Sequence, residues 1–421
     1  MNRHPGRFEQ ESLAHRVALA RQRYFSDGLV PSGIVSDAVL QSWSRCHDAR
    51  HDPRDEVGFE PVTHSGIDIA LQRNSPLLRA WSGELAQMQA ALASTSCAAM
   101  LTDASGILIG ATCVGRAHEA LMPVATRLGV DLSEEAVGTT APGIVAKTGK
   151  QVSVLGGEHY FEEVRAMQCA AAPIRDTSGR LAGVLDLSSE CMPFAFDPAA
   201  VVGLYAAAIE NRMLVDASRE LLVLMFQVGA ALIDSPMAGL IGIDGHGDIV
   251  WANAVARRLA GLGERAIAIP LASAEEVFGL NLPALLALPR AGAMPLQLAS
   301  GLTVWARAEL RAPDGRSNLF VLDPARRVMR DPAPVATPVA SAVPDDHVAP
   351  FAAMPASCSL RAADQDLIAR TLRACDGNVA RAARELGVSR GLVYRRLRDG
   401  ATAPAAPLAV PLAPDGRSPL C

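Results

Sequence analysis

Residues 97–111, CAAMLTDASGILIGA, decide the fold of the largest block of this chain. Two short apolar runs flank Asp103-Ala-Ser-Gly106, and a polar turn between such runs is typical of a β-hairpin. Residues 170–187 repeat the same pattern. Helical spacing of apolar residues before these hairpins, and again from about Val201, predicts helices on either side of the sheet. We therefore expect a domain of the α+β class over 96–200.

A further hairpin begins a second α+β block, which we place at 236–327. Its turn is Asp244-Gly-His-Gly247, and a helix at 253–262 follows the return strand. Three later strands are expected at 295–298, 303–310 and 319–323. Before the first sheet the pattern differs, since apolar spacing over 1–95 predicts a mainly helical region.

Composition excludes several classes of protein. The 421 residues allow two to four domains, and half of them are apolar, which excludes wholesale disorder. A net charge of −5 argues against a polyanion binder along the whole chain. No apolar leader and no apolar run of about 20 residues are present, so we expect a cytoplasmic protein that does not bind membranes. The eight scattered cysteines lack a C-x-x-C pair and indicate reduced thiols.

The amino-acid composition changes in the last hundred residues. Residues 328–360 and the tail at 401–421 are rich in Pro and Ala, which predicts a linker and a disordered end. Between them, 361–400 has the pattern of three short helices, with Asn378 and Ser389 as caps of the second and third. Six arginines and one acid lie in the last two helices, so the charge here is strongly positive. These features are typical of a helix-turn-helix.

The run 377–398, GNVARAARELGVSRGLVYRRLR, resembles the Fis-type helix-turn-helix of bacterial transcription activators. The resemblance implies an all-α module that binds double-stranded DNA through its third helix. A three-helix bundle used only for dimerisation is the alternative. The residues expected to contact DNA are Ser389, Arg390, Gly391, Tyr394, Arg395, Arg396 and Arg398.

Several N-terminal motifs resemble those of the acetoin-catabolism and dihydroxyacetone-operon regulators. They are Ser42-Trp-Ser-Arg-Cys46, His51-Asp-Pro53, Leu101–Gly106, Glu134–Gly143, Gly157–Tyr160, Cys169–Asp176 and Gly183–Leu187. This resemblance implies that the first block is a GAF sensor domain for a small-molecule effector, and 236–327 resembles a PAS domain. Polar groups that interrupt apolar strands suggest where the effector binds. The expected effector contacts are Glu134, Thr139, Thr140, His159, Tyr160 and Cys169. At Thr140 the relatives usually carry Asn.

Most full-length regulators of this type also carry a central AAA+ ATPase, and no such segment follows the PAS-like block. The nearest approach to a phosphate-binding loop, Gly143–Gln151, has the wrong glycine spacing and Gln where Ser or Thr is needed. We therefore expect a regulator without its own ATPase, which recruits or blocks RNA polymerase or joins an ATPase-bearing relative. A scaffold that titrates such relatives is a further alternative.

A GAF-type thiol enzyme or redox sensor is the competing interpretation. Its nucleophile would be Cys97, Cys113 or Cys169, with His118 or His159 nearby. Apolar surroundings favour buried, inert thiols, so we expect no enzymatic activity. His47 and His51 have the spacing of a helical metal site, but solvated side chains are the better interpretation, and we expect neither a metal nor a cofactor.

The connecting segment 201–232 is predicted to be a helix that forms a homodimer. Its apolar positions follow a 3-4 spacing, and Asn211 would set the register of the two helices. Packing of this helix on its own sheet is the alternative. The proposed seam consists of Val201, Leu204, Ala208, Asn211, Val215, Ser218, Leu222 and Met225.

Overall fold

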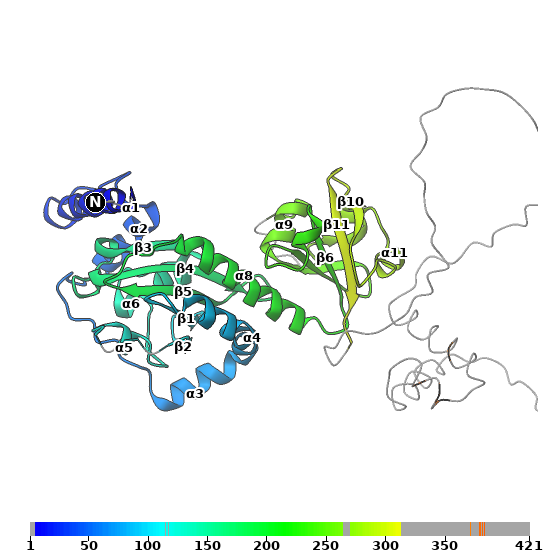
Figure 1. The fold of residues 1–421 in the computed structure, drawn as a ribbon, viewed down its shortest axis with the longest axis horizontal. Helices are drawn as coiled ribbons and strands as arrows, with labels where there is room; N and C mark the ends of the chain where they lie inside the picture. Colours follow the sequence, from blue (N-terminus) through cyan, green and yellow to red (C-terminus); the bar gives the residue numbers. More distant parts are fainter. Residues whose placement is uncertain are drawn as a thin grey trace, which may run out of the picture. The chain divides into compact units, whose positions relative to one another are not determined.

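The computed structural model describes residues 5–312, except 114, 117 and 264–269, and in addition four residues of the C-terminal module. Contacts divide the chain into two units, 1–317 and 318–421. The first unit contains two antiparallel sheets with helices (Figure 1), so its architecture is mixed α/β. The four residues described in the second unit are helical, and Ala383 among them is buried. They are Thr371, Val379, Arg381 and Ala383.

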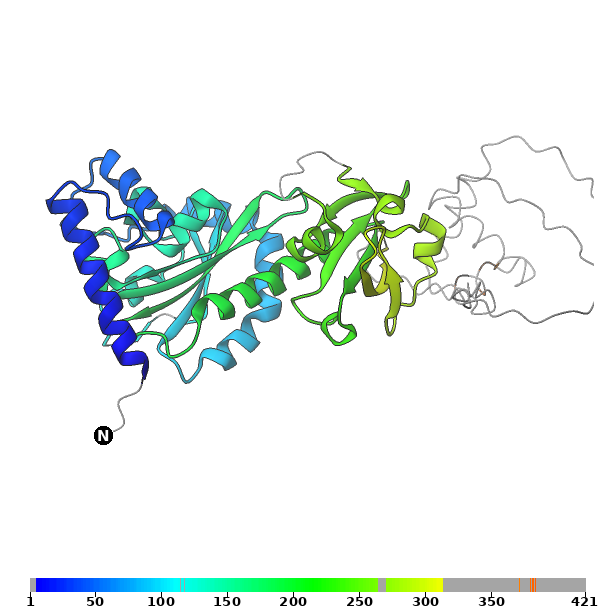
Figure 2. The ribbon, with the colours of Figure 1, turned by 90° about the horizontal axis from the view of Figure 1, so that it is seen from above.

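The predicted helical character of the N-terminal region is confirmed. Four helices lie there, α1 (Pro5–Arg21), α2 (Asp37–Asp48), α3 (His64–Arg73) and α4 (Ser75–Leu92), with a π-helical turn over Gln22–Ser26. Ser36 caps the start of α2, since its hydroxyl accepts a hydrogen bond from the Val39 amide at 3.3 Å. Figure 2 shows α1 as a long helix beside the first sheet.

The first sheet has the strand order β2-β1-β5-β4-β3. Its strands are β1 (Cys97–Asp103), β2 (Leu108–Ala111), β3 (Val152–Leu155), β4 (Met167–Arg175) and β5 (Leu181–Glu190). Both predicted hairpins are confirmed, since β1 pairs with β2 and β4 pairs with β5, each antiparallel. Three short helices are inserted between β2 and β3: α5 (Met122–Ala125), α6 (Glu134–Val137) and α7 (Ala141–Thr148).

Side chains alternate between the two faces of this sheet. One face packs under α4 and α8 (Pro198–Ala217), with Leu101 and Leu185 in its apolar core. We call the opposite side the inner face, and it packs against α2, α5 and α7. The inner face consists of Ala98, Met100 and Thr102 of β1, Cys169 and Ala171 of β4, and Val184, Asp186 and Ser188 of β5.

The expected helix over 201–232 is wrong beyond residue 217. Helix α8 ends at Ala217, and β6 (Leu222–Gln227) follows it. Leu222 to Phe226 form a short continuous apolar run, which suits a strand buried on both faces, and all six residues of β6 are buried. Leu222 and Met225 therefore belong to a sheet and not to a helical seam.

Asn211 also has a different role from the predicted one. Its amide group donates to the Pro236 carbonyl at 3.1 Å, and its side-chain oxygen accepts from the Asn253 amide at 2.8 Å. These bonds satisfy Asn211 within its own chain, so it is not free to set a dimer register. Homodimerisation itself stays a prediction, and Leu204 on α8 is 45% exposed.

The second sheet has the order β10-β11-β6-β7-β8-β9. Its further strands are β7 (Gly239–Ile243), β8 (Asp248–Ala252), β9 (Ala272–Ser273), β10 (Met294–Gln297) and β11 (Thr303–Leu310). The predicted hairpin of β7 and β8 is confirmed, and so are the strands near 295 and 303. The block begins at 222 and not at 236, because β6 lies in the middle of the sheet. The strand expected at 319–323 lies outside the described residues.

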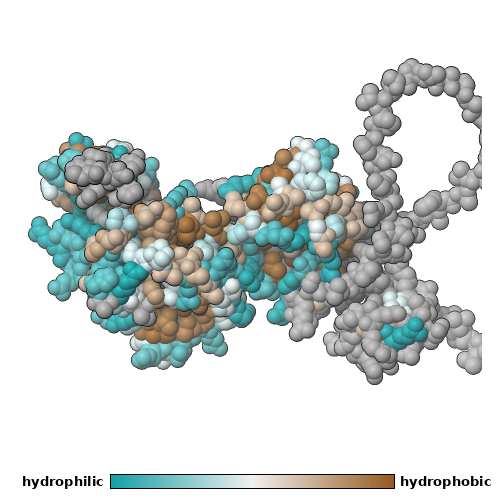
Figure 3. Space-filling model, in the orientation of Figure 1, coloured by the Kyte–Doolittle hydropathy of each residue, from teal (hydrophilic) through white to brown (hydrophobic). Residues whose placement is uncertain are grey.

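Three short helices accompany the second sheet: α9 (Ala254–Ala260), α10 (Ala274–Phe278) and α11 (Leu282–Leu286). Asn253 caps α9 by accepting from the Ala256 amide at 2.8 Å. The surface in Figure 3 is mostly hydrophilic with separate apolar patches, and Ile69 and Leu128 are among the exposed large apolar side chains. None of the helices in the described part of the chain has the length and apolar character to cross a membrane.

Candidate functional site

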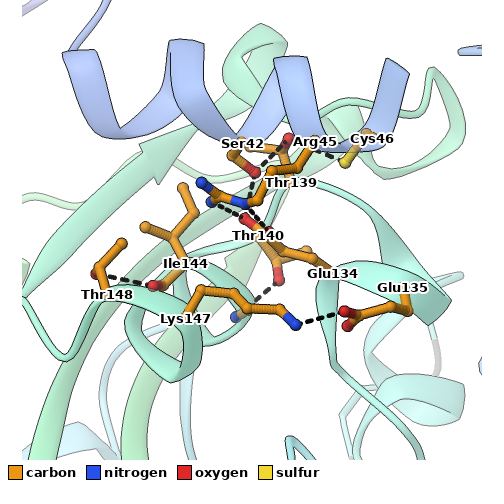
Figure 4. Close-up of polar contacts among 11 residues, drawn as sticks. Ser42, Arg45, Cys46, Glu134, Glu135, Thr139, Thr140, Ile144, Lys147 and Thr148 are labelled. Carbon is orange, nitrogen blue, oxygen red and sulfur yellow. Dashed lines mark hydrogen bonds and ion pairs between the residues drawn. The ribbon is translucent and has the colours of Figure 1, made fainter. Parts of the chain in front are cut away.

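An ion pair with a buried carboxylate and a half-buried guanidinium joins α2 to α6. The Arg45 guanidinium donates to both carboxylate oxygens of Glu134, from Nε at 2.6 Å and from Nη2 at 2.7 Å (Figure 4). The Ser42 hydroxyl donates to the same carboxylate at 2.5 Å. The Glu134 side chain is only 4% exposed, and its hydrogen bond raises the pKa of Arg45. Glu134 was expected to contact the effector, but its carboxylate is engaged by α2.

Thr139 and Thr140 complete this junction. The Ser42 hydroxyl gives its proton to Glu134, so the Thr139 hydroxyl donates to the Ser42 oxygen, 2.8 Å away. Cys46 lies 3.7 Å from the Thr139 hydroxyl, and burial raises the pKa of this thiol to about 11. Thr140 caps α7 by accepting from the Gly143 amide at 3.2 Å. Asn also caps helices, so Thr140 can make the same kind of bond in its place.

Figure 4 also shows a surface pair beside the junction, in which the Lys147 ammonium contacts the Glu135 carboxylate. This hydrogen bond lowers the pKa of Glu135. The pair holds the start of α6 to α7 and leaves Glu134 on the buried side. The Ser-Trp-Ser-Arg motif of α2 therefore has a structural explanation, because two of its four side chains bind the α6–α7 segment.

A second buried polar group begins at His159. His159 follows a 3-10 turn at Gly156–Glu158, and its ring Nδ1–H donates to the Gly156 carbonyl at 2.9 Å. Its Nε2 is then the acceptor, 3.5 Å from the Cys169 sulfur on β4. Burial lowers the pKa of His159 to about 4, so the ring is neutral near pH 7.

Ser188 and Asp186 on β5 continue this polar group across the inner face. The Ser188 hydroxyl lies 3.1 Å from the Cys169 sulfur and donates to Asp186 Oδ2 at 2.5 Å. Burial raises the pKa of Asp186 to about 7 and raises that of Cys169 well above its usual value. The other carboxylate oxygen, Asp186 Oδ1, is buried with no hydrogen-bond partner. We call His159, Cys169, Ser188 and Asp186 the polar chain.

Tyr160 lies apart from the polar chain. Its hydroxyl donates to the His51 carbonyl at 2.8 Å, and its ring packs edge-to-face on Phe25 and Phe161. Burial raises the pKa of Tyr160 to about 12. The Arg21 guanidinium at the end of α1 donates to the backbone carbonyls of His159 and Tyr160 at 2.5 and 2.9 Å. Tyr160 therefore belongs to an aromatic core that fastens α1 and α2 to the sheet.

The six expected effector residues thus fall into three places. Glu134, Thr139 and Thr140 hold α2, α6 and α7 together, and Tyr160 lies in the aromatic core. Of the six, only Cys169 lies on the inner face, with His159 beside it. An apolar crevice lies on the opposite side of the sheet, and none of the six lines it. Its lining consists of Met88, Leu92, Ala99, Leu185, Asp186, Leu187, Val201, Val202 and Tyr205.

Sequence reasoning missed the central residues of the inner face. Asp186 and Ser188 interrupt an apolar strand at alternate positions, and this spacing was the signal that could have found them. Sequence reasoning also missed Thr102 of β1, and its hydroxyl is likewise buried without a partner. The expected DNA contacts, from Ser389 to Arg398, lie outside the described residues.

Of the three candidate thiols, Cys97 and Cys169 show no sign of activation, and Cys113 is exposed. Cys97 and Cys169 are buried, and burial raises both pKa values, whereas a catalytic thiol needs a lowered one. His159 beside Cys169 is neutral and so offers no cation to stabilise a thiolate. Among the described residues, no three His, Cys, Asp or Glu side chains come together as a metal site would require.

Comparison with known proteins identifies two segments. Residues 14–210 match the MimR N-terminal domain, and residues 359–399 match the bacterial regulatory protein, Fis family. The first segment covers α2 to α8 and the whole of the first sheet. The second covers the predicted helix-turn-helix.

Relatives match about half of this chain. The acetoin catabolism regulatory protein of Cupriavidus necator is 30% identical over 230 residues, which are 53% of this chain and 34% of the relative. The propane 2-monooxygenase operon transcriptional activator MimR of Mycolicibacterium smegmatis is 29% identical over 198 residues, 46% of this chain and 32% of the relative. The chain therefore spans about a third of the length of these two proteins.

An uncharacterised 47.3 kDa protein of Rhodococcus erythropolis is 30% identical over 186 residues, which are 42% of either chain. Its length is thus close to that of the present chain. The resemblance to acetoin-type operon regulators is confirmed: this chain joins a MimR-type N-terminal domain to a Fis-family helix-turn-helix.

Proposed function

We propose that this chain is a transcriptional regulator that binds specific double-stranded DNA sequences in response to a small polar metabolite. The observation that carries the proposal is the presence, in one chain, of a MimR-type N-terminal domain and a Fis-family helix-turn-helix. In this proposal residues 96–200 act as a GAF-type sensor. The second sheet, which begins at Leu222, is a PAS-like block between the sensor and the DNA-binding module.

The DNA contacts come from the last predicted helix. Arg390 stands near its start, where side chains of a helix-turn-helix usually reach base edges in the major groove. Arg398 stands at its far end and is expected to contact phosphate. A base-reading arginine gives sequence preference, whereas a phosphate contact supports all sequences alike.

Regulation acts through occupancy of DNA. The given sequence has no phosphate-binding loop of the G-x-x-x-x-G-K-[ST] type, and in this proposal the residues of this chain regulate without hydrolysing ATP. The effector shifts occupancy only as far as its affinities for two conformations or dimer arrangements differ. RNA polymerase or an ATPase-bearing relative is the proposed protein partner.

The test uses the full chain and an operator selected with it from random duplexes. Arg390→Ala should weaken operator binding by ~1–3 kcal/mol and relax the sequence preference. Arg398→Ala should weaken operator and random DNA equally. Arg180→Ala is the control, because this side chain is 82% exposed and lies on a turn of the first sheet. Full-strength binding by Arg390→Ala in a gel-shift titration would refute the assignment of the recognition helix.

A further inference from the structure

Two buried polar atoms without partners lie on the inner face of the first sheet. They are Asp186 Oδ1 and Thr102 Oγ1, and both residues are fully buried. In the pairing of β1 with β5, Asp186 is opposite Met100 and Thr102 is opposite Val184. The two residues are therefore diagonal neighbours on one face, ~7–8 Å apart between their Cα atoms.

Such a pair is unusual in a folded protein. Nearly all buried polar groups have a hydrogen-bond partner, and an unpaired one destabilises the folded state. Three other buried side-chain atoms in the described residues lack a partner, Arg165 Nε, Trp251 Nε1 and Arg311 Nε. In both arginines another nitrogen of the same guanidinium makes an ion pair. Among the described residues, the inner face is the one place where two buried atoms without a partner lie on neighbouring strands.

The polar chain holds the Asp186 carboxylate in one orientation. Ser188 occupies Oδ2, Cys169 lies beside Ser188, and His159 lies beside Cys169. Oδ1 thus has no partner and can take a hydrogen bond from a ligand. The side chains directly opposite Asp186 are Ala171, which is small, and Met100, which is unbranched and adaptable.

Charge and geometry restrict the ligand. A carboxyl group repels an anion, and burial among the apolar residues of the inner face penalises any ion, so the face favours an uncharged molecule. The carboxyl group can accept from a hydroxyl when ionised and can donate to it when protonated. The Thr102 hydroxyl can also donate or accept. A compound with two hydroxyl groups on adjacent or next-but-one carbons has the reach to bond both residues.

We propose that Asp186 and Thr102 form an effector subsite for a small uncharged diol, with Ser188, Cys169 and His159 as positioning residues behind the carboxyl group. This inference rests on the proposed function, because it names the ligand class and the contacts of the same sensor. It replaces Glu134, Thr139, Thr140 and Tyr160 as ligand contacts.

The test is isothermal titration calorimetry of the full chain with propane-1,2-diol and propane-1,3-diol. Wild-type protein should bind at least one of them with one site per chain, and propan-1-ol should bind at least tenfold more weakly. Asp186→Asn and Thr102→Val should each weaken diol binding at least tenfold. Both substitutions nearly preserve side-chain volume, and thermal unfolding checks that the variants fold.

Glu210→Gln is the matched control. Glu210 is another buried carboxyl group of the same domain with a pKa raised to about 7 by burial, but its Oε2 accepts from the Arg175 amide at 2.8 Å. This variant should bind the diol as the wild type does. Failure of both diols to bind the wild type, or equal binding by Asp186→Asn and Thr102→Val, would overturn the proposal.

Operator binding by the same samples separates the two proposals. A chain that binds its operator but neither diol refutes the subsite and leaves the regulator standing. A chain that selects no DNA sequence refutes the proposed function, whatever it binds in the sensor.

Discussion

The two sheets of the first unit are built from the same hairpin pattern but differ in what they bury. The inner face of the first sheet carries Asp186, Ser188 and Thr102 among its apolar residues, and two of their oxygen atoms have no partner. The second sheet buries an apolar core in which Phe226 and Phe278 pack edge-to-face, 5.5 Å between ring centres. The two sheets therefore differ in their buried polar groups and not in their strand pattern. This difference makes the first sheet the candidate sensor and the second sheet the candidate relay.

The polar groups that the second sheet does bury serve its backbone. Asn253 accepts from the amides of Leu240 and Ala256 and donates to the Ala238 carbonyl. The buried Gln227 amide donates to the Met237 carbonyl at 2.6 Å. Such bonds fix loops and a helix start. Trp251 Nε1 on β8 is also buried without a partner, but it stands alone, whereas the first sheet has two such atoms on neighbouring strands.

The largest expected effect removes packing from the second sheet. Phe278→Ala should lower the free energy of unfolding by ~4 kcal/mol, because it opens a cavity in a fully buried core. Affinity for propane-1,2-diol should not change, since the proposed subsite lies in the first sheet. Urea unfolding and calorimetry measure the two quantities, with Phe278→Leu as the milder control. A tenfold loss of diol affinity in folded Phe278→Ala would mean that both sheets form the site.

The next prediction compares the loss of stability when one ion pair is broken in each of the two sheet blocks. Arg45→Ala should lower the free energy of unfolding by ~3 kcal/mol, because it leaves the Glu134 carboxylate buried without its counter-ion. In the second block the Arg307–Asp234 pair is exposed, with the Asp234 side chain 74% accessible. Asp234→Ala should therefore cost less than ~1 kcal/mol. Equal losses in urea unfolding would show that the α2–α6 junction is not a structural element.

A smaller effect concerns pH. Burial raises the pKa of Asp186 to about 7, above the ~3.9 of an unfolded chain. The folded state then binds more protons, so stability falls as pH rises from about 4 to about 7. Asp186→Asn removes this contribution, so relative to the variant the wild type should lose ~1.5 kcal/mol between pH ~5.5 and ~7.

Two other groups titrate in this range and serve as references for that measurement. Glu210, with its pKa raised to about 7, gives the same trend, and His159, with its pKa lowered to about 4, gives the opposite trend below pH ~6.5. Both remain in Asp186→Asn and cancel in the comparison. Parallel stability curves for the wild type and Asp186→Asn would show that Asp186 is ionised in the folded state.

Local pattern predicted most of the fold. The turns Asp103–Gly106 and Asp244–Gly247 marked their hairpins because their sequences have local turn chemistry. The helix after the first sheet was extended too far, because the apolar run after Ala217 suits a buried strand as well as a helix. Only pairing with β7 and β11, which are distant in sequence, decides between them.

The candidate site was harder to predict because its contacts are long-range. Glu134 stands in a motif that looks like a ligand loop, but its partner Arg45 lies 89 residues earlier, on α2. His159 and Cys169 were found because they are polar groups in apolar surroundings. Asp186 has the same signature, yet its missing partner becomes visible only when β1, β4 and β5 are placed side by side.

We propose that the inner face of the first sheet controls DNA occupancy without ATP. Fluorescence anisotropy of the selected operator tests this proposal, with full-length wild type and Asp186→Asn titrated at several diol concentrations and no nucleotide. We expect diol to change the operator affinity of the wild type at least threefold and to leave that of Asp186→Asn unchanged. An equal change in both proteins, or a change that requires hydrolysable ATP, would contradict it.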